Sequence, residues 1–438
     1  MKVVSRSEFA QTLYERLTNE EDARVCRDIS EEACRATPGN FVLILASQCL
    51  TKLGDAVTNP KTVLAWVATS VGAPSAVLGL LVPIRESGSL IPQLVVGGLV
   101  RRLARRKWVW VAGSLLQGLA VVGMAAAASS LTGWAAGAGL LVSLTLFSLA
   151  RGLCSVASKD VIGKTVPKGR RGQLTGWSAS VAGVISLAIG GVFLLSALDG
   201  ANVEQLAVVL LLGAATWLVA AGVYGMVREE PGETDGGGNA LKESLGNLRL
   251  IATDRAFRTF VIARSLLMCS ALSAPYYVAL AQQHSDAGGR LLGAFIVAGG
   301  SAGLLSGPVW GRFADLSSRR VMLTAAILTS ATGILVALLG FREVPGLGSI
   351  WLMPGAYFLL SIAHSGVRVG RKTYVVDLAS GNRRTDYVSV SNSIIGVLLL
   401  LVGLSGLLAG QIGASGMIGL LSIMGAMGAL VASKLPEV

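Results

Sequence analysis

Arg85 and Glu86 are the residues of this sequence whose types and position could carry out ion chemistry. They lie in the middle of an apolar run, residues 75–99, and at 1.5 Å per helical residue they are roughly 15 Å from either end. That depth is the midplane of a bilayer, where an ionised side chain is costly unless it is paired or hydrated. The pair therefore predicts a site for protons or a charged substrate; the alternative is a charge pair that locks helix packing.

A second set of opposite charges precedes this pair in the chain. Lys52 and Asp55 are three residues apart and share one face of a helix. Two interpretations stay open: a Lys52–Asp55 pair that bridges a packed interface, or a carboxylate at Asp55 that binds and releases a proton. Glu86 is the stronger candidate for protonation because its surroundings are more apolar. Arg85 would either neutralise Asp55 or meet an anionic substrate.

A third candidate set lies nearer the end of the chain. His364, Arg368 and Lys372 recur every four residues and so share one helix face, with Arg371 beside them. A hydrated histidine titrates near neutrality, which would suit proton coupling, whereas the alternative role is a hydrogen-bond partner in packing. For the basic residues, and also for Arg264, the alternative is that their long side chains snorkel to the membrane interface.

The elements that would position these residues are membrane-spanning helices. Of the 438 residues, 53% are hydrophobic and 14% are charged, and the 55 glycines suit close helix packing in a membrane. Residues 108–150 and 387–433 contain no charged residue, and each run is long enough for two spans of about 20 residues. The expected fold is an all-α membrane protein with twelve transmembrane helices. Apolar runs and helix breakers predict spans at 41–65, 75–99, 108–128, 134–158, 174–196, 205–227, 259–282, 291–311, 321–341, 349–371, 388–411 and 414–433.

Basic residues alternate between the two sides of the predicted membrane. They gather in the loops after spans two, four, six, eight and ten, whereas opposite loops such as 129–133 and 196–204 hold almost none. Because an excess of Lys and Arg marks cytoplasmic loops, both chain termini are predicted to lie in the cytoplasm. This placement also explains the net charge of +12 without any binding of nucleic acid.

The chain divides into four parts by composition. Residues 1–40 are polar and lack the features of a signal peptide, so we predict a cytoplasmic helical extension that ends at Pro38-Gly39. This extension either folds against the protein body or binds a regulatory partner. Residues 41–227 and 259–438 would be two six-helix bundles, joined by a polar cytoplasmic linker at 228–258. A shift of about 213–214 residues aligns the two bundles in the same orientation, a plan found in secondary transporters.

The two repeats share a loop that resembles the signature G-x-L-A-D-R-x-G-R-[KR] of the major facilitator superfamily. The second copy keeps the acidic residue as Asp315, whereas the first copy has Arg101 in its place. The resemblance covers about residues 40–434 and implies that these loops help to hold the two halves together at the cytoplasmic side. The basic first copy would alternatively bind anionic lipid head groups. The candidate gating residues are Gly97, Arg101, Arg105, Arg106, Gly311, Asp315, Arg319 and Arg320.

Other features narrow the comparison with this family. Arg151-Gly152 is similar to the span-four arginine that is linked to proton coupling in some drug exporters, although it lies closer to the basic loop. The Gly-Pro pair of the exporters' antiporter signature is missing from span five, and Gly307-Pro308 occurs in span eight instead. Residues 52–106 also resemble bacterial members of the family that have no assigned substrate. The missing Gly-Pro pair argues against classical drug–proton exchange but leaves efflux open.

The resemblance implies a secondary transporter of a bacterial inner membrane that works by alternating access. Basic candidates inside the spans outnumber acidic ones, which favours a small organic anion or an acidic amphiphile as substrate, coupled to protons. The alternatives are an exporter of drugs or metabolites, and a non-transporting sensor or assembly protein that signals through its N-terminal extension. The candidates for substrate binding and proton coupling are Lys52, Asp55, Arg85, Glu86, Arg151, His364 and Arg368.

Several classes of chemistry have no support in the sequence. It contains no phosphate-binding loop for ATP, no nucleophile–base arrangement, and no metal-ligand spacing among its five cysteines and two histidines. We therefore expect a monomeric transporter without a cofactor or a metal. When the two repeats are aligned, Arg85 and Glu86 of the first correspond to Gly299 and Gly300 of the second. The N-terminal half is thus expected to carry the ion chemistry, and the C-terminal half to form a smoother wall.

Overall fold

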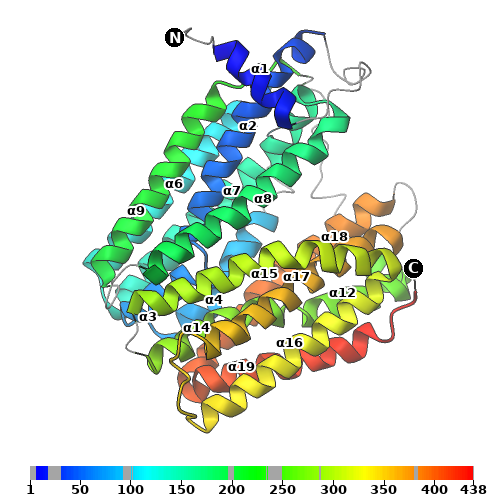
Figure 1. Ribbon diagram of the computed structural model, residues 1–438. Coiled ribbons are helices and arrows are strands. Elements are labelled where there is room, and N and C mark those ends of the chain that lie inside the picture. Colours follow the sequence, from blue (N-terminus) through cyan, green and yellow to red (C-terminus); the bar gives the residue numbers. More distant parts are fainter. Residues whose placement is uncertain are drawn as a thin grey trace.

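The protein is built from long, apolar helices (Figure 1). The computed structural model describes residues 6–17, 31–91, 100, 102–195, 202–232, 234, 249–285, 288–378 and 383–437. Among these residues there is no strand, and eight helical stretches are long and apolar enough to cross a membrane. The longest of them, Val390–Ala432, has 43 residues. The all-α membrane fold is therefore confirmed, while the count of twelve spans stays a prediction.

The N-terminal half packs around α6. This helix lies against α7 and α9, and α2 also packs against α9. Aromatic pairs join these helices: Phe147 meets Trp217 edge to face with centroids 5.1 Å apart, and Trp110 stacks on Tyr224 at 3.9 Å. The helices are α1 (Arg6–Leu17), α2 (Glu31–Val57), α3 (Val63–Ser70), α4 (Ser75–Leu90), α6 (Lys107–Ser130), α7 (Gly133–Thr165), α8 (Lys168–Leu195) and α9 (Val203–Gly225).

The C-terminal half repeats this packing around α16, which lies against α17 and α19. Gly413 inside α19 has a φ of 69°, a conformation that glycine adopts at no steric cost, so the last two predicted spans part at this residue. The helices are α11 (Arg249–Thr253), α12 (Arg255–Leu266), α13 (Cys269–Leu272), α14 (Ala274–Gln283), α15 (Gly288–Leu316), α16 (Ser318–Phe341), α17 (Leu352–Leu378), α18 (Arg383–Gly403), the 3-10 helix η1 (Leu404–Leu408) and α19 (Ala409–Ala432).

The expected helix break at Pro38-Gly39 is wrong, because α2 runs through both residues into the first span. Proline removes one backbone donor, but neighbouring side chains hold this turn. The Thr37 hydroxyl donates to the carbonyl four residues earlier at 3.0 Å. Asn40 exchanges two hydrogen bonds with the backbone of Arg228, at 2.8 and 2.9 Å. Tertiary contacts thus override the local signal.

The N-terminal extension folds against the body through α1. Tyr14 meets Phe41 of α2 edge to face with centroids 5.4 Å apart. Trp177 of α8 donates its indole N–H to the carbonyl of Leu17 at 3.1 Å. In the described part of the extension, the packing interpretation therefore holds. Residues 18–30 lie outside the described residues.

Spans one and seven, predicted at 41–65 and 259–282, are interrupted at corresponding places. The first breaks at residues 58–62, between α2 and α3, and the repeat offset carries this segment onto 271–275 in the interrupted run from α12 to α14. Pro60 and Pro275 lie in these segments and lack a backbone N–H. Broken helices in equivalent positions of two repeats are where transporters place their binding sites.

The two halves touch at one end and separate toward the other (Figure 1). A Cβ on Gly79 would lie 2.5 Å from Gly406 Cα, and one on Gly190 would lie 2.6 Å from a methyl group of Val297. A Cβ on Gly176, two turns from the crossing of α8 with α15, would meet no atom within 4 Å. The halves therefore separate at the end that carries the basic loops.

Candidate functional site

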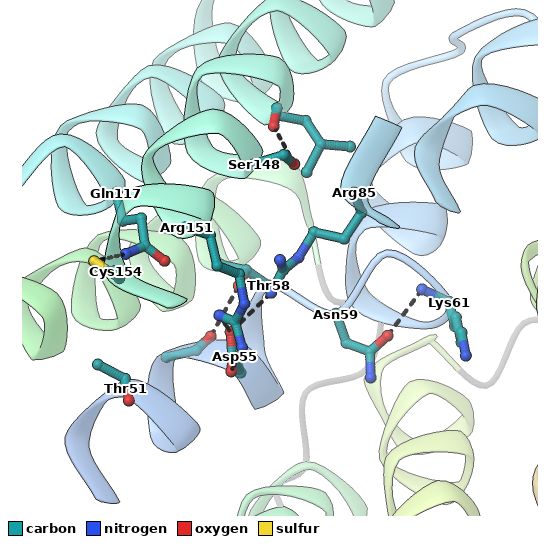
Figure 2. Close-up of polar contacts among 12 residues, drawn as sticks. Thr51, Asp55, Thr58, Asn59, Lys61, Arg85, Gln117, Ser148, Arg151 and Cys154 are labelled. Atoms are coloured by element: carbon teal, nitrogen blue, oxygen red, sulfur yellow. Dashed lines mark hydrogen bonds and ion pairs between the residues drawn. The ribbon is translucent and has the colours of Figure 1, made fainter. Parts of the chain in front are cut away.

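Asp55 is the centre of an ion triad within the N-terminal half (Figure 2). Its carboxylate accepts two parallel hydrogen bonds from Arg151 of α7, at 2.5 and 2.7 Å. Arg85 of α4 donates a third at 3.0 Å and also lies over the ring of Phe147, 4.6 Å from its centroid. Bidentate guanidinium–carboxylate pairs are strong and directional. The triad therefore fixes α2, α4 and α7 relative to one another.

Lys52 does not complete this triad. Although it lies one turn before Asp55, no ion pair joins the two among the described residues. The Lys52 side chain instead lines a cavity between the two halves, which is described below. Of the two open interpretations, the structure therefore shows no Lys52–Asp55 bridge, and it engages Asp55 with Arg85 and Arg151. This arrangement also matches the expectation that Arg85 neutralises Asp55.

A polar chain crosses between the halves at the break of span one. The turn is held by Asn59, whose side-chain oxygen accepts the backbone N–H of Lys61 at 2.9 Å (Figure 2). The Lys61 ammonium contacts His364 Nε2 at 2.9 Å, and His364 Nδ1 contacts the Ser270 hydroxyl at 3.0 Å. An ammonium only donates, so Nε2 accepts and the ring proton resides on Nδ1, facing Ser270. His364 is thus the acceptor that ties Lys61 to the C-terminal half.

Two chambers that share lining residues lie between the halves. The first, which we name the polar chamber, has a volume of ≈ 500 Å³. Most of its wall consists of polar side chains and glycines, and seven of its 24 lining residues are apolar. It borders α2, α8, α15 and α17. Gly299 and Gly300 belong to its wall, as the expectation of a smooth surface there requires. Its polar side chains include Lys52, Asn59, Ser178, Ser186, Tyr357 and Ser361.

The second, which we name the apolar chamber, has a volume of ≈ 580 Å³. It lies between α4, α12, α13, α17 and α18 and shares Lys61, His364, Ser365 and Arg368 with the polar chamber. These four residues therefore form the boundary between the chambers. Nine of its lining residues are apolar: Leu90, Leu267, Met268, Ala271, Val367, Val375, Val388, Ile395 and Leu399.

Glu86 opens into the apolar chamber and is exposed there. Unlike Asp55, it forms no ion pair within 4 Å among the described residues, although Lys61 and Arg371 interact with its charge at longer range. Among the described residues that line the two chambers, Glu86 is the only acidic one. The two carboxylates singled out in the sequence therefore differ: Asp55 is engaged and Glu86 is accessible.

The C-terminal half supplies most of the basic lining, against the expectation of a smoother wall. Arg368, Arg371 and Lys372 of α17 all line the apolar chamber, so they do not simply snorkel to the membrane interface. The expectation of a smooth wall came from aligning Arg85 and Glu86 with Gly299 and Gly300, which lie in α15. The basic residues lie instead in α17, which packs beside α15. Sequence periodicity placed these residues on one helix face but could not show that this face points inward.

Arg264, at the end of α12, also lines the apolar chamber. It is buried, and its guanidinium donates to the hydroxyl of Ser391 and to the side-chain oxygen of Asn392, both at 2.7 Å. Its Nε is buried without a hydrogen-bond partner. No carboxylate of the described residues lies within 4 Å of this cation, which is unusual for a buried charge.

The first gating loop is tied to its own half. Gly97 and Arg101 lie outside the described residues, and Arg105 is exposed. Arg106 pairs with Asp160 of α7. Further along, buried Glu229 accepts the backbone N–H groups that start α6, at 3.1 and 2.7 Å, and a negative charge is favourable at a helix N-terminus.

The second gating loop is likewise closed on its own half. Arg319 and Arg320 lie 3.7 and 3.5 Å from the carboxylate of Glu437. Asp315 is exposed and forms no ion pair with a described residue, and Gly311 has open space around it. Each ion pair that the structure describes for these loop residues therefore stays within one half.

Lys61 is the site residue that the sequence least suggests. It follows Asn59 and Pro60 within the predicted first span and belongs to none of the candidate sets named from the sequence. The signal that could have found it is the proline itself: a span broken at mid-depth frees its end residues to face a cavity. Arg264 and Arg371 were noticed, but only as residues for interface snorkelling.

Comparisons with known proteins agree with this architecture. The sequence model described as Major Facilitator Superfamily matches residues 44–308. No curated protein matches the chain. A D-xylose-proton symporter of known structure aligns with a TM-score of 0.67 at 14% identity, covering 91% of this chain and 98% of that one.

Two further structures show the same likeness. The xylose transporter XylE from E. coli, in an inward open conformation, has a TM-score of 0.65 at 13% identity and covers 91% of this chain and 97% of that one. A POT family transporter in complex with a thioalcohol conjugated peptide has a TM-score of 0.68 at 11% identity, covering 90% and 95%. At such identities the likeness concerns the fold and not the substrate.

Proposed function

Because the chain belongs to the major facilitator superfamily, we propose that it transports a small organic anion together with protons. Family and fold are those of a membrane transporter and not of an enzyme. We further propose a bacterial inner membrane with both termini in the cytoplasm, in line with the positions of the basic loops. The described state is then open to the cytoplasm and closed on the other side.

The observation that carries the proposal is the charge balance of the cavity lining. Six basic side chains and one acidic side chain line the two chambers in the described part of the chain. Asp55 does not offset them, since two guanidinium groups already engage it. Such a low-dielectric cleft of one sign concentrates anions. The basic residues are Lys52, Lys61, Arg264, Arg368, Arg371 and Lys372.

Glu86 supplies the proposed proton coupling. When ionised, its carboxylate is the local counter-charge of Lys61 and Arg371, and it competes with an anionic substrate for them. Proton uptake removes this competitor, so the proton and the anion bind together. Arg85 and Arg151 also interact with the charge of Glu86, but both donate hydrogen bonds to Asp55. The resulting cycle is proton–anion symport.

Reconstituted vesicles test this function. An inward proton gradient should drive accumulation of a substrate carboxylate, and Glu86→Gln should abolish that accumulation while leaving exchange of anion for anion intact. The exchange arm shows that the variant is folded and binds substrate. Gradient-driven accumulation by Glu86→Gln at the wild-type rate would remove Glu86 from the coupling role, and transport of cations alone would refute the anion assignment.

A further inference from the structure

We propose that the substrate is an amphipathic acid whose anionic group binds at Arg264 and whose apolar body occupies the apolar chamber. This inference rests on the proposed function and narrows its substrate class. A hydrophilic acid, such as a sugar acid, would instead belong in the polar chamber. The two chambers differ enough in their walls for the choice to be made from the residues.

The wall of the apolar chamber suits a hydrocarbon body. Nine of its eighteen lining residues are apolar, and they come from α4, the turn between α12 and α13, α13, α17 and α18. Ile395, Leu399 and Met268 are otherwise buried among neighbours. Each methylene of a substrate that is buried against these nine residues adds binding free energy.

Arg264 suits the acidic group. Its guanidinium is oriented by Ser391 and Asn392, so it is already held in place before a ligand arrives. It has an unpartnered buried Nε and no described carboxylate nearby, which leaves its charge uncompensated. Arg371 and Lys372 of α17 lie close enough to interact with it electrostatically. A bound anion would neutralise this group of cations.

The polar chamber offers a different environment. Of its cations, Lys61 and Arg368 are shared with the apolar chamber, and Lys61 is already bonded to His364, so Lys52 is the cation that the described lining of this chamber has alone. Ser178, Ser186 and Ser361 add hydroxyl groups that would suit a hydrated ligand. The unneutralised buried cation and the apolar wall occur together in the other chamber.

The chain-length dependence of binding tests this assignment. Dissociation constants of acetate, butyrate and hexanoate would be derived from the ligand-dependent rise of the unfolding temperature of the purified full-length protein. Affinity should increase about fourfold per methylene. Gluconate has the six carbons and the single charge of hexanoate but a hydroxylated chain, and it should bind at least tenfold more weakly. Hexylammonium should not bind.

Matched substitutions locate the two ends of the ligand. Ala271→Leu adds apolar bulk to the apolar chamber and should lower the affinity for hexanoate relative to acetate, whereas Ala182→Leu adds the same bulk to the polar chamber and should leave that ratio unchanged. Arg264→Gln should weaken both acids about tenfold, and Arg264→Lys should restore part of the loss. If Ala271→Leu does not fold, Val388→Thr keeps the side-chain shape and replaces the same chamber's apolar surface.

The outcomes separate this inference from the proposed function. Equal binding of gluconate and hexanoate, or equal effects of Ala271→Leu and Ala182→Leu, would overturn the inference and leave anion transport standing. Equal binding of hexylammonium would show nonspecific partitioning and would overturn it as well. Failure of every acid to bind would contradict the proposed function itself.

Discussion

The two halves of the protein use charge in opposite ways. In the N-terminal half, Asp55 is saturated by Arg85 and Arg151, and the ion triad braces three helices. In the C-terminal half, Arg264 and the basic residues of α17 face the cavity without a described acidic partner. The paired charges therefore hold helices together, and we assign the unpaired charges to substrate binding. Glu86, Lys52 and Lys61 are the exceptions in the N-terminal half, since they line the cavity and form no described ion pair within 4 Å.

The largest effect is expected from breaking the triad. Asp55→Asn leaves two guanidinium groups facing each other, and losing one partner of a buried ion pair costs roughly 3 kcal/mol of unfolding free energy. The unfolding temperature in detergent should fall markedly. Transport that is lost while stability is unchanged would contradict the bracing role and return Asp55 to proton coupling.

The matching test in the C-terminal half should affect binding and spare stability. Arg371→Gln removes an unpaired cavity charge, so the affinity for a substrate carboxylate should drop about tenfold, which corresponds to about 1.4 kcal/mol. Its unfolding temperature without ligand should stay close to that of the wild type. A loss of stability as large as that of Asp55→Asn would erase the distinction between the two halves.

A smaller effect is expected where the halves meet. His364→Leu removes the acceptor of the Lys61 ammonium, a loss of about 1 kcal/mol that favours separation of the halves at this depth. Spin labels at positions 176 and 311 would report the change as a shifted distance distribution. An unchanged distribution would mean that Lys61 finds an equally good partner elsewhere.

The smallest effect concerns the extension. Trp177→Phe deletes the hydrogen bond to Leu17 and should lower stability by less than about 1 kcal/mol, with no change in transport. Limited proteolysis of the N-terminal segment would reveal a loosened α1. Loss of transport in this variant would support the rival interpretation that the extension has a signalling or regulatory role.

The sequence predicted the helical membrane architecture and the family well, because both depend on hydrophobic runs and repeated loop residues. It also identified Asp55, Arg85 and Glu86 as charges at depth. It could not show which helix faces converge: Arg371 and Arg264 have the same local signature whether they snorkel outward or line a cavity. Nor did local propensity reveal that Asn40 and Thr37 carry α2 through Pro38, since that depends on contacts distant in the chain.

The central claim is that ionised Glu86 competes with the substrate anion for Lys61 and Arg371. The direct test compares the dissociation constant of the tightest-binding carboxylate of the acetate–hexanoate series in the wild type and in Glu86→Gln at one neutral pH. Because the substitution removes the competing charge, the variant should bind this carboxylate about tenfold more tightly, which corresponds to about 1.4 kcal/mol. Equal or weaker binding by Glu86→Gln would contradict the claim.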